Sequence, residues 1–492
     1  MKRFLLIVAA LVWSLSLLAQ NRLGMTTGNY AGINSIHLNP SSMINSEYFL
    51  DVHLAGGGVF VLNNYMFLRK EDYSIGSLLF QPKDFTTFTG EMGDDRYVDA
   101  WNRKELKHGF SNVQLFGPSA MITVGQNSFG FYTGFRSLIN VKDFSYDVAK
   151  NAYEGLDYPP FHGEVFNQNR DMHLEAIQFS EIALSYSRYV YTRNYDKLDV
   201  GITFKYLIPH NAVKLHIDNI EYMMPNSDVL NVYDLNADLR MASPVNYNNS
   251  NVPDGGGWIK GGGFAVDLGV TYTKTKKLQR SYQRFTRLCH QEQPAYDYRI
   301  GLSIMDLGSI TLRNNVQVHR YRDVEAVWPD VGNIDYESVS DALQEVSTQL
   351  LGTPGASLSD EARFSMGLPT ALSLQADYHY YRNWYLHSTL IYGLPGGATG
   401  FNRASYFSVM PRWESALFGA GLPVSMHRFR QPQVGFNLRL AYLTVGTSNL
   451  SHYLGLSELN GVDFYFSLKF SLKKGNCRGS SKDGCRGQEY GF

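Results

Sequence analysis

Beyond residue 19, the 492-residue sequence has no apolar run of the roughly 20 residues that a transmembrane helix needs. The one apolar stretch, Phe4–Leu18, follows Lys2 and Arg3 and precedes Ala19. A basic start, an apolar middle and a small residue at the cut are the parts of a secretory signal peptide. Residues 1–19 are therefore predicted to be removed. The alternative, an uncleaved membrane anchor, would need a longer apolar run.

Cysteine is scarce, with three residues in the whole chain. Cys477 and Cys485 lie in a polar, glycine-rich tail, residues 474–492, and could close a small disulfide loop in an oxidising compartment. Cys289 would then be left over, and three separate thiols fit the sequence equally well. The residue directly after the predicted cut is Gln20 and not a cysteine, which argues against a lipid-anchored lipoprotein.

Neither sign of charge dominates, because loss of Lys2 and Arg3 leaves 42 basic against 45 acidic residues. This balance argues against nucleic acid as a partner. The segment 274–287 is an exception, with six basic residues and no acidic one. It could meet lipid phosphates or an acidic protein partner, although a solvated connection is the simpler interpretation.

Familiar catalytic and cofactor motifs are also missing. The sequence has no phosphate-binding glycine loop, His-Glu-x-x-His, Cys-x-x-Cys or Gly-x-Ser-x-Gly, so no enzyme activity and no cofactor are expected. His210 and His216 lie close in sequence, and His379 and His387 fall on neighbouring predicted strands. Neither pair shows a carboxylate or cysteine at ligand spacing, so no metal site is predicted.

What the sequence does contain is tyrosine (33), phenylalanine (29) and glycine (45), together with many segments in which apolar and polar residues alternate. Period two predicts β-strands with one apolar face. The strong segments are 198–206, 264–273, 298–304, 372–379, 434–442 and 462–473. The weaker ones are 48–62, 113–125, 128–141, 178–191, 384–393, 404–413 and 415–427. Because a bacterial membrane barrel needs an even number of strands, one more is expected within 64–88, 211–235 or 312–328.

A soluble sandwich would also show alternation, so strand length and the second face must decide. Residues 462–473 alternate throughout, whereas a tilted membrane-spanning strand needs only about 9 to 11 residues. Opposite the apolar faces stand mostly Gly, Ser, Thr, Ala and Asn, as in a crowded lumen. Short connections such as 193–197 combine with long ones such as 211–260 and 314–362, which is typical of outer-membrane barrels. One long connection holds a predicted helix, residues 335–351.

The fold class predicted is therefore all-β, a transmembrane antiparallel barrel with long loops. Segment 462–472 is expected to be the closing strand and to pair with the first strand, 48–62, so that no edge is left open. The inward faces carry equal numbers of charges of each sign, which argues against an ion-selective pore. Their mutual pairing is expected to fill and stiffen a narrow lumen. These lumen-facing charges are Asp199, Lys205, Asp267, Arg299, Asp377, Arg439, Asp463 and Lys469.

Four segments, Thr27–Ser42, Gly367–Tyr380, Gly435–Leu450 and "GVDFYFSLKF" from Gly461, carry a resemblance to a known family. With them the chain resembles a Bacteroidota family of uncharacterised outer-membrane β-barrels, known only as a domain of unknown function. It is more distantly similar to the long-chain fatty-acid transporter superfamily and to the barrel that shuttles cargo in type IX secretion.

This resemblance implies about 14 strands and a short N-terminal segment inside the lumen that includes Asn39, Pro40, Ser41 and Ser42. Fatty-acid transporters tend to have Asn-Pro-Ala there, whereas this chain has Ser41 and lacks a long apolar hatch. The residues themselves predict only a turn that begins at Asn39-Pro40, with Ser41 or Ser42 capping a helical turn.

The chain thus divides into a signal peptide (1–19), a lumen segment (20–45), a barrel (46–473) and a tail (474–492). The predicted place is the outer membrane, in contact with its lipids and with periplasmic or surface protein partners. The balanced lumen favours a structural, assembly or secretion-associated component with a largely plugged lumen. Passive transport of hydrophobic or small solutes is the alternative, and a hydrolase embedded in the barrel wall is the least favoured function.

Overall fold

A computed structural model describes residues 22–69, 98–156, 158–253, 257–279, 295–333, 338–396 and 400–472. The predicted signal peptide, the tail, Cys289, Cys477 and Cys485 lie outside these residues. The chain is all-β, as predicted, with 63% of the described residues in strands and 12% in helices. In the described part of the chain, no helix is both long and apolar enough to cross a membrane.

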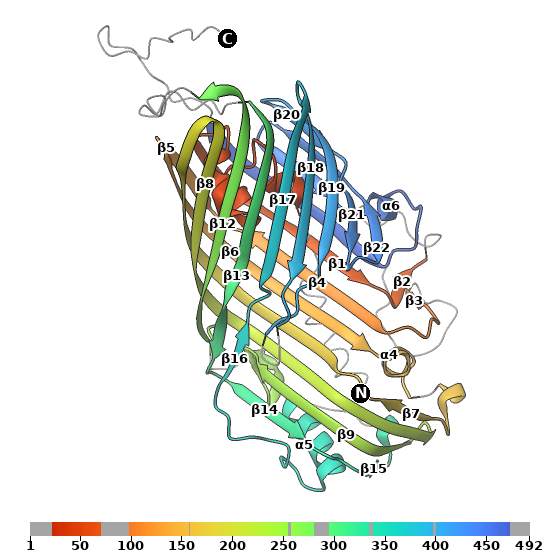
Figure 1. Ribbon diagram of the computed structural model, residues 1–492. Coiled ribbons are helices and arrows are strands. Elements are labelled where there is room, and N and C mark those ends of the chain that lie inside the picture. The colour runs from red at the N-terminus through yellow and green to blue at the C-terminus, as the bar shows by residue number, and fades with distance from the viewer. Residues whose placement is uncertain are drawn as a thin grey trace.

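The strands form a closed antiparallel barrel (Figure 1). In chain order, the first strands are β1 (Leu50–Asn63), β2 (Met66–Leu68), β3 (Val98–Ala100), β4 (Lys107–Phe116), β5 (Ser119–Val124), β6 (Asn127–Phe144), β7 (Val165–Gln168), β8 (Met172–Asn226), β9 (Val229–Ala242), β10 (Val245–Asn246), β11 (Asn249–Pro253) and β12 (Gly261–Gln279). Of these, β2 with β3 and β10 with β11 form two separate two-stranded sheets. Those that follow are β13 (Tyr296–Leu312), β14 (Val316–Tyr321), β15 (Ala326–Trp328), β16 (Phe364–Gly367), β17 (Ala371–Tyr381), β18 (Trp384–Gly393), β19 (Tyr406–Glu414), β20 (Phe418–Gly421), β21 (Val424–His427), β22 (Gln431–Val434), β23 (Phe436–Leu440), β24 (Leu443–Thr447) and β25 (Gly461–Leu472).

Helices are few and short. They are α2 (Leu23–Thr26), η1 (Gly32–His37), η2 (Pro40–Asn45), α4 (Tyr146–Glu154), η3 (Pro159–Phe161), η5 (Val331–Asn333), α5 (Val339–Leu351) and α6 (Leu450–Tyr453). The predicted helix corresponds to α5, which begins after Ser338, whose side chain accepts a hydrogen bond from Asp341 N at 3.0 Å. It ends at Gly352, whose φ of 81° suits a residue without a side chain.

The longest strand, β8, is folded on itself as a hairpin. Ser185 on its first arm contacts Thr203 on its second, with 2.8 Å between hydroxyl oxygens, and the turn contains Asn194 at a φ of 54°. With β8 counted once the barrel has 13 strands, and with its two arms counted separately it has 14, the even number expected.

The predicted closure is confirmed, because β25 pairs with β1 from Leu472 opposite Leu50 to Gly461 opposite Leu62. The position predicted for the missing strand is wrong. It is β24, which lies between β23 and β25 and was overlooked because only five residues form it. Residues 211–235 and 312–328 do form strands, but these belong to an extension of the wall.

The outer wall carries a belt of exposed apolar side chains. On β25, Val462, Phe464, Leu468 and Phe470 are 38 to 46% exposed, while Asp463 and the other alternating residues are buried. Such a belt would be unfavourable in water and suits contact with lipid hydrocarbon. Aromatic residues mark its two edges: Tyr380, Tyr381, Trp384 and Tyr442 near the turns that join β17 to β18 and β23 to β24, and Tyr206, Trp258 and Phe264 at the opposite edge.

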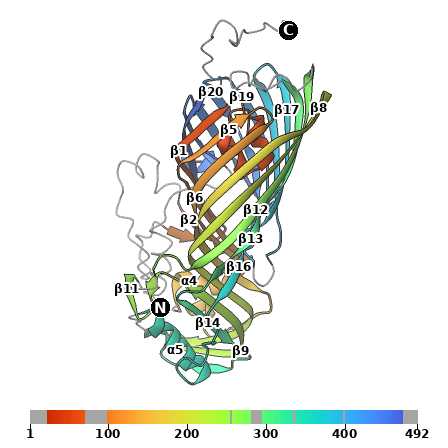
Figure 2. The ribbon, with the colours of Figure 1, turned by 90° about the vertical axis from the view of Figure 1, so that its left-hand side faces the viewer.

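The edge near the β17–β18 and β23–β24 turns is called here the short-turn end, and the opposite edge is called the long-loop end. Beyond the long-loop end, the second arm of β8 continues with β9, β14 and β15 into an extension that α5 covers (Figures 1 and 2). Leu343 and Val339 of α5 pack against Met241 of β9, while Val346 and Leu350 pack near Tyr321.

Candidate functional site: the filled lumen

The predicted lumen segment, residues 20–45, is described from residue 22. Residues 22–46 lie inside the barrel with α2, η1 and η2, and the name lumen segment is used for them from here on. Six of their apolar side chains are almost completely buried, each at most 3% exposed: Leu23, Met25, Ile33, Ile36, Met43 and Ile44. Ile33, Ile36 and Met43 pack against inward-facing wall residues such as Phe116, Met121 and Tyr132. The segment is therefore part of the core of the barrel.

Asn39 joins the lumen segment to the wall. Its Oδ1 accepts hydrogen bonds from Ser41 N (3.0 Å) and Ser41 Oγ (2.7 Å), and Pro40 is the first residue of η2. The helical turn is thus present, but Asn39 caps it in place of Ser41 or the half-buried Ser42, because only the Asn39 side chain precedes the first turn. Asn39 Nδ2 also donates to Gln375 Oε1 at 2.9 Å, and Ser41 Oγ lies 2.7 Å from Thr271 Oγ1.

Three glycines on adjacent strands let the segment approach the wall. A Cβ atom at Gly201 would collide with the backbone of Pro40 and Ser41, and one at Gly269 or Gly301 with the Asn39 side chain. Gly201 and Gly269 are direct cross-strand partners. Close backbone approach is a common reason for glycine inside a strand.

A network of buried charges lies next to the segment and centres on Asp306. This residue has a φ of 57° and sits in a bulge of β13, opposite Asp267 on β12. Its carboxylate is 2.8 and 2.9 Å from two guanidinium nitrogens of Arg136, 2.7 Å from Lys205 Nζ and 3.6 Å from Arg403. Lys205 also contacts Asp267 at 2.7 Å. Buried charges need such partners, because desolvation is costly.

Other predicted lumen charges hold the lumen segment instead of one another. Asp199 accepts from Asn45 Nδ2 at 2.7 Å, and Arg299 donates to Asn29 Oδ1 at 2.8 Å. Lys469 donates to the carbonyls of Tyr30 (3.0 Å) and Ala31 (2.8 Å) and contacts Asp51 at 3.1 Å, while Arg439 lies over the Tyr30 ring at 4.3 Å.

The remaining two predicted charges bind wall groups. Asp377 pairs with Arg412 at 2.7 Å, and Asp463 accepts from Ser448 N. Within the described residues, only Lys205 and Asp267 of the eight predicted charges form an ion pair with each other, so the expected mutual pairing is corrected. Sequence reasoning missed their partners, Asp51, Arg136, Asp306 and Arg412, because the register of a closed barrel decides which strands meet.

A small polar cavity of about 40 Å³ separates the lumen segment from the charge network. Arg22, Gln114, Arg136, Asp306 and Arg403 contribute to its lining. Its volume suits about one water molecule. It has room for water but not for an organic solute.

Residues 400–405, which lead into β19, fill the lumen a second time, nearer the long-loop end. Phe401 is completely buried, and Asn402 donates from N (2.9 Å) and Nδ2 (2.8 Å) to the Glu175 carboxylate. Lys214 Nζ donates to the Gly400 carbonyl at 2.9 Å. Burial lowers the pKa of Lys214, and the nearby Glu175 carboxylate opposes this shift.

Between these closures the inner wall is apolar. Buried apolar side chains from ten strands and the β18–β19 connection form one cluster with the lumen segment. Its members in this part of the lumen include Phe60, Leu62, Phe110, Leu138, Phe179, Leu207, Ile310, Leu312, Phe364, Met366 and Phe401.

The histidine pairs singled out in the sequence do not meet. His210 Nε2 lies 2.8 Å from Ser180 Oγ, whereas His216 stacks on a third histidine, His173. His379 stacks on Tyr385, while His387 Nδ1 lies 3.9 Å from Asp377.

A closed antiparallel barrel with an apolar belt, aromatic edges and a polar, filled interior defines an outer-membrane-type β-barrel. The chain belongs to a family of unknown function (DUF5723), which it matches over residues 40–448. The predicted resemblance to such a family is confirmed. No curated protein matches the chain.

Solved structures with a related arrangement include hydrocarbon channels and a FadL homologue. The Ralstonia pickettii toluene transporter TbuX shares 10% identity over 92% of this chain and 97% of its own, with a TM-score of 0.41. The Pseudomonas putida toluene transporter TodX shares 10% identity over 90% of this chain and 93% of its own, with a TM-score of 0.41. A Pseudomonas aeruginosa FadL homologue shares 9% identity over 91% of this chain and 95% of its own, with a TM-score of 0.30. Scores this low transfer neither activity nor substrate.

Proposed function

We propose that this protein is a passive transporter of small hydrophobic solutes across the outer membrane, held closed in this structure by the lumen segment and by residues 400–405. The observation that carries the proposal is the apolar inner wall between the two closures. A channel for polar solutes has a polar, water-filled interior, whereas the cluster around Phe60, Phe110 and Phe364 would favour an apolar solute.

The nature of the contacts supports a movable closure. The lumen segment and the wall are joined by hydrogen bonds that involve Asn39, Asn45 and Lys469. Water can replace such partners when the segment moves, so their net contribution is modest, about 1 kcal/mol for a neutral hydrogen bond. With long loops outside, as in bacterial barrels, the segment would close the periplasmic side.

A structural or assembly component is the second candidate, and one observation favours it. The same apolar side chains fill the lumen completely, with Phe179, Phe401 and Met366 all at 0% exposure. A permanently solid barrel would leave its extension, with α5 and β9, as the working surface for protein partners.

A reversible disulfide between segment and wall separates the two candidates. In a variant whose three native cysteines are replaced by serine, Ser41→Cys and Thr271→Cys place two sulfurs where hydroxyls now lie 2.7 Å apart. The control is Ser185→Cys with Thr203→Cys, which joins the two arms of β8 at a similar distance and does not link the segment to the wall.

The assay is entry of N-phenylnaphthylamine into cells that make each variant, because an intact outer membrane excludes this apolar dye. Transport predicts that the Ser41–Thr271 lock lowers entry several-fold, that reductant restores it, and that the control lock has no effect. Equal entry with and without the protein would contradict transport and leave the assembly role.

A further inference from the structure

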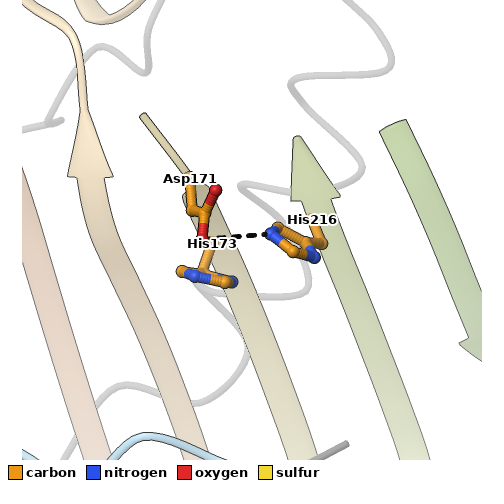
Figure 3. Close-up of side chains that lie close together, drawn as sticks. All are labelled: Asp171, His173 and His216. Carbon is orange, nitrogen blue, oxygen red and sulfur yellow. Dashed lines mark ion pairs between the residues drawn. The ribbon is translucent and has the colours of Figure 1, made fainter. Parts of the chain in front are cut away.

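A cluster of metal-ligating side chains lies on the two arms of β8, on the long-loop side of the belt (Figure 3). Asp171 immediately precedes the first arm, His173 lies at the start of that arm, and His216 lies on the second arm. One potential ligand atom from each lies within 4.8 Å of the other two. Neither the proposed transport function nor the lumen charges account for this cluster.

The hairpin explains how the cluster forms. His173 and His216 stack face to face across the two arms, with ring centroids 4.4 Å apart and planes inclined by 23°. Asp171 precedes His173 by two residues and Asp218 follows His216 by two, so the order Asp-x-His on one arm is reversed to His-x-Asp on the other. In a strand, residues two apart share a face, which gathers all four side chains.

The histidine rings offer nitrogens that are free for a ligand. His173 Nδ1 and His216 Nε2 are both shielded from solvent. His173 Nδ1 has no hydrogen-bond partner, and His216 Nε2 faces only the carboxylates of Asp171 and Asp218. Asp171 Oδ2 lies 3.9 Å from His216 Nε2, and Asp218 Oδ1 lies 3.3 Å from the same atom. A buried polar atom without a partner calls for an explanation such as a bound ion or water.

Neighbouring charges do not occupy these nitrogens. Next to the histidines, in the same row of the sheet, are Lys142 on β6 and Asp238 on β9. Lys142 pairs with Asp143 at 3.5 Å, and Asp238 is bound by Arg322 at 2.8 Å.

We infer that Asp171, His173 and His216 form a site for a divalent transition-metal ion of the Zn²⁺ type. Two imidazoles and a carboxylate suit Zn²⁺, Cu²⁺ or Ni²⁺, whereas Mg²⁺ and Ca²⁺ prefer oxygen ligands alone. Zinc ligands lie about 2.0–2.2 Å from the ion and hence about 3.4 Å from one another, so the three groups must close in by side-chain rotation. Asp171 can move, because its side chain is 65% exposed.

The site has a defined place in the barrel. His173 and His216 each lie two residues from Glu175 and Lys214, which pair at 3.4 Å and bind residues 400–402 inside the lumen. Regular pairing runs through both stretches, so the histidines share this inner face. A bound ion would fasten the two arms of β8 beside the outer closure and keep a coordination position open to solvent.

The test is Zn²⁺ titration by calorimetry of the full chain, purified in detergent without a histidine tag. One equivalent should bind to the unmodified protein, and His173→Asn or His216→Asn should each lower the affinity by at least about tenfold, because even indirect partners of metal ligands matter that much. Asp171→Asn should weaken binding as well. The matched control, His379→Gln, removes a histidine from another strand and should leave the affinity unchanged.

A folding check accompanies each variant, since a folded barrel and a heated one migrate differently on a gel. Loss of the single equivalent in folded His173 and His216 variants supports the site. Equal binding by these variants and His379→Gln, or no stoichiometric binding by the unmodified chain, would overturn it and leave a His216–Asp218 ion pair as the explanation.

Discussion

At the short-turn end of the barrel, charged and amide side chains fill the lumen, and the lumen segment is fixed by groups such as Asn39, Asp199 and Lys469. Toward the long-loop end, Phe60, Leu312 and other apolar side chains occupy the same inner wall. The outer faces of the two halves are alike, because lipid hydrocarbon requires apolar side chains on both. The interior alone therefore distinguishes a polar half, which binds the segment, from an apolar half, which could accept a hydrophobic solute.

The largest effect is expected where the two halves meet, at Asp306. Asp306→Ala leaves Arg136, Lys205 and Arg403 without their shared carboxylate, and an uncompensated buried charge costs about 3–5 kcal/mol. Urea unfolding in detergent should show this loss. The control, Asp297→Ala on the same strand, removes a carboxylate that is 50% exposed and should cost less than about 1 kcal/mol. Similar losses in both variants would refute the central role of Asp306.

The outer face provides the next test. Phe466 lies midway along β25, between exposed Phe464 and Leu468. Phe466→Arg should cost about 2–4 kcal/mol in a bilayer, whereas Phe470→Arg, nearer the short-turn end, should cost about 1 kcal/mol or less. Folding into lipid vesicles at graded urea measures both. Equal costs would mean that β25 does not cross the hydrocarbon at the proposed depth.

The glycines under the lumen segment test whether the polar half acts as a closure. Gly269→Ala forces a methyl group against Asn39 and Pro40, and overpacking costs about 1–3 kcal/mol. Entry of N-phenylnaphthylamine should rise as the segment is displaced. Gly262→Ala on the same strand is the control, because its new Cβ would lie 3.8 Å from Tyr206 Oη, at ordinary contact distance. No difference between the two variants would show that the segment tolerates displacement without opening a path.

The sequence predicted the outer face better than the interior, for a physical reason. Lipid requires an apolar residue at every second position, so strands such as β12, β17 and β25 were recognised from local alternation. Only five residues form β24, which is too short for that signal. The interior depends on contacts between distant residues, as with Arg136 and Asp306, which are 170 positions apart.

Some interior features did leave a local trace. Asp306 follows Ile304 and Met305 at the point where the alternation of β13 is interrupted, which is how a bulge appears in a sequence. Asp171-x-His173 and His216-x-Asp218 mirror each other about the turn at Asn194, so the predicted short connection 193–197 would have brought them together. The sequence carries no comparable signal for the role of an inward-facing apolar residue. It does not distinguish a residue that packs against another side chain from one that lines a path for a solute.

The smallest effect is expected in the extension, far from both halves of the lumen. Ser338→Ala removes the side-chain oxygen that accepts from Asp341 N at the start of α5, and loss of such a cap costs about 1 kcal/mol. Because α5 packs on β9 and β15 outside the belt, the loss should appear as faster hydrogen exchange in α5 alone, with dye entry and barrel unfolding unchanged. Ser340→Ala, a half-buried position in the first turn, is the control, since its hydroxyl accepts only a long hydrogen bond of 3.4 Å from Gln344 Nε2. If Ser338→Ala changed dye entry, the extension would be coupled to the lumen. The difference between the two halves of the lumen would then depend on α5 as well.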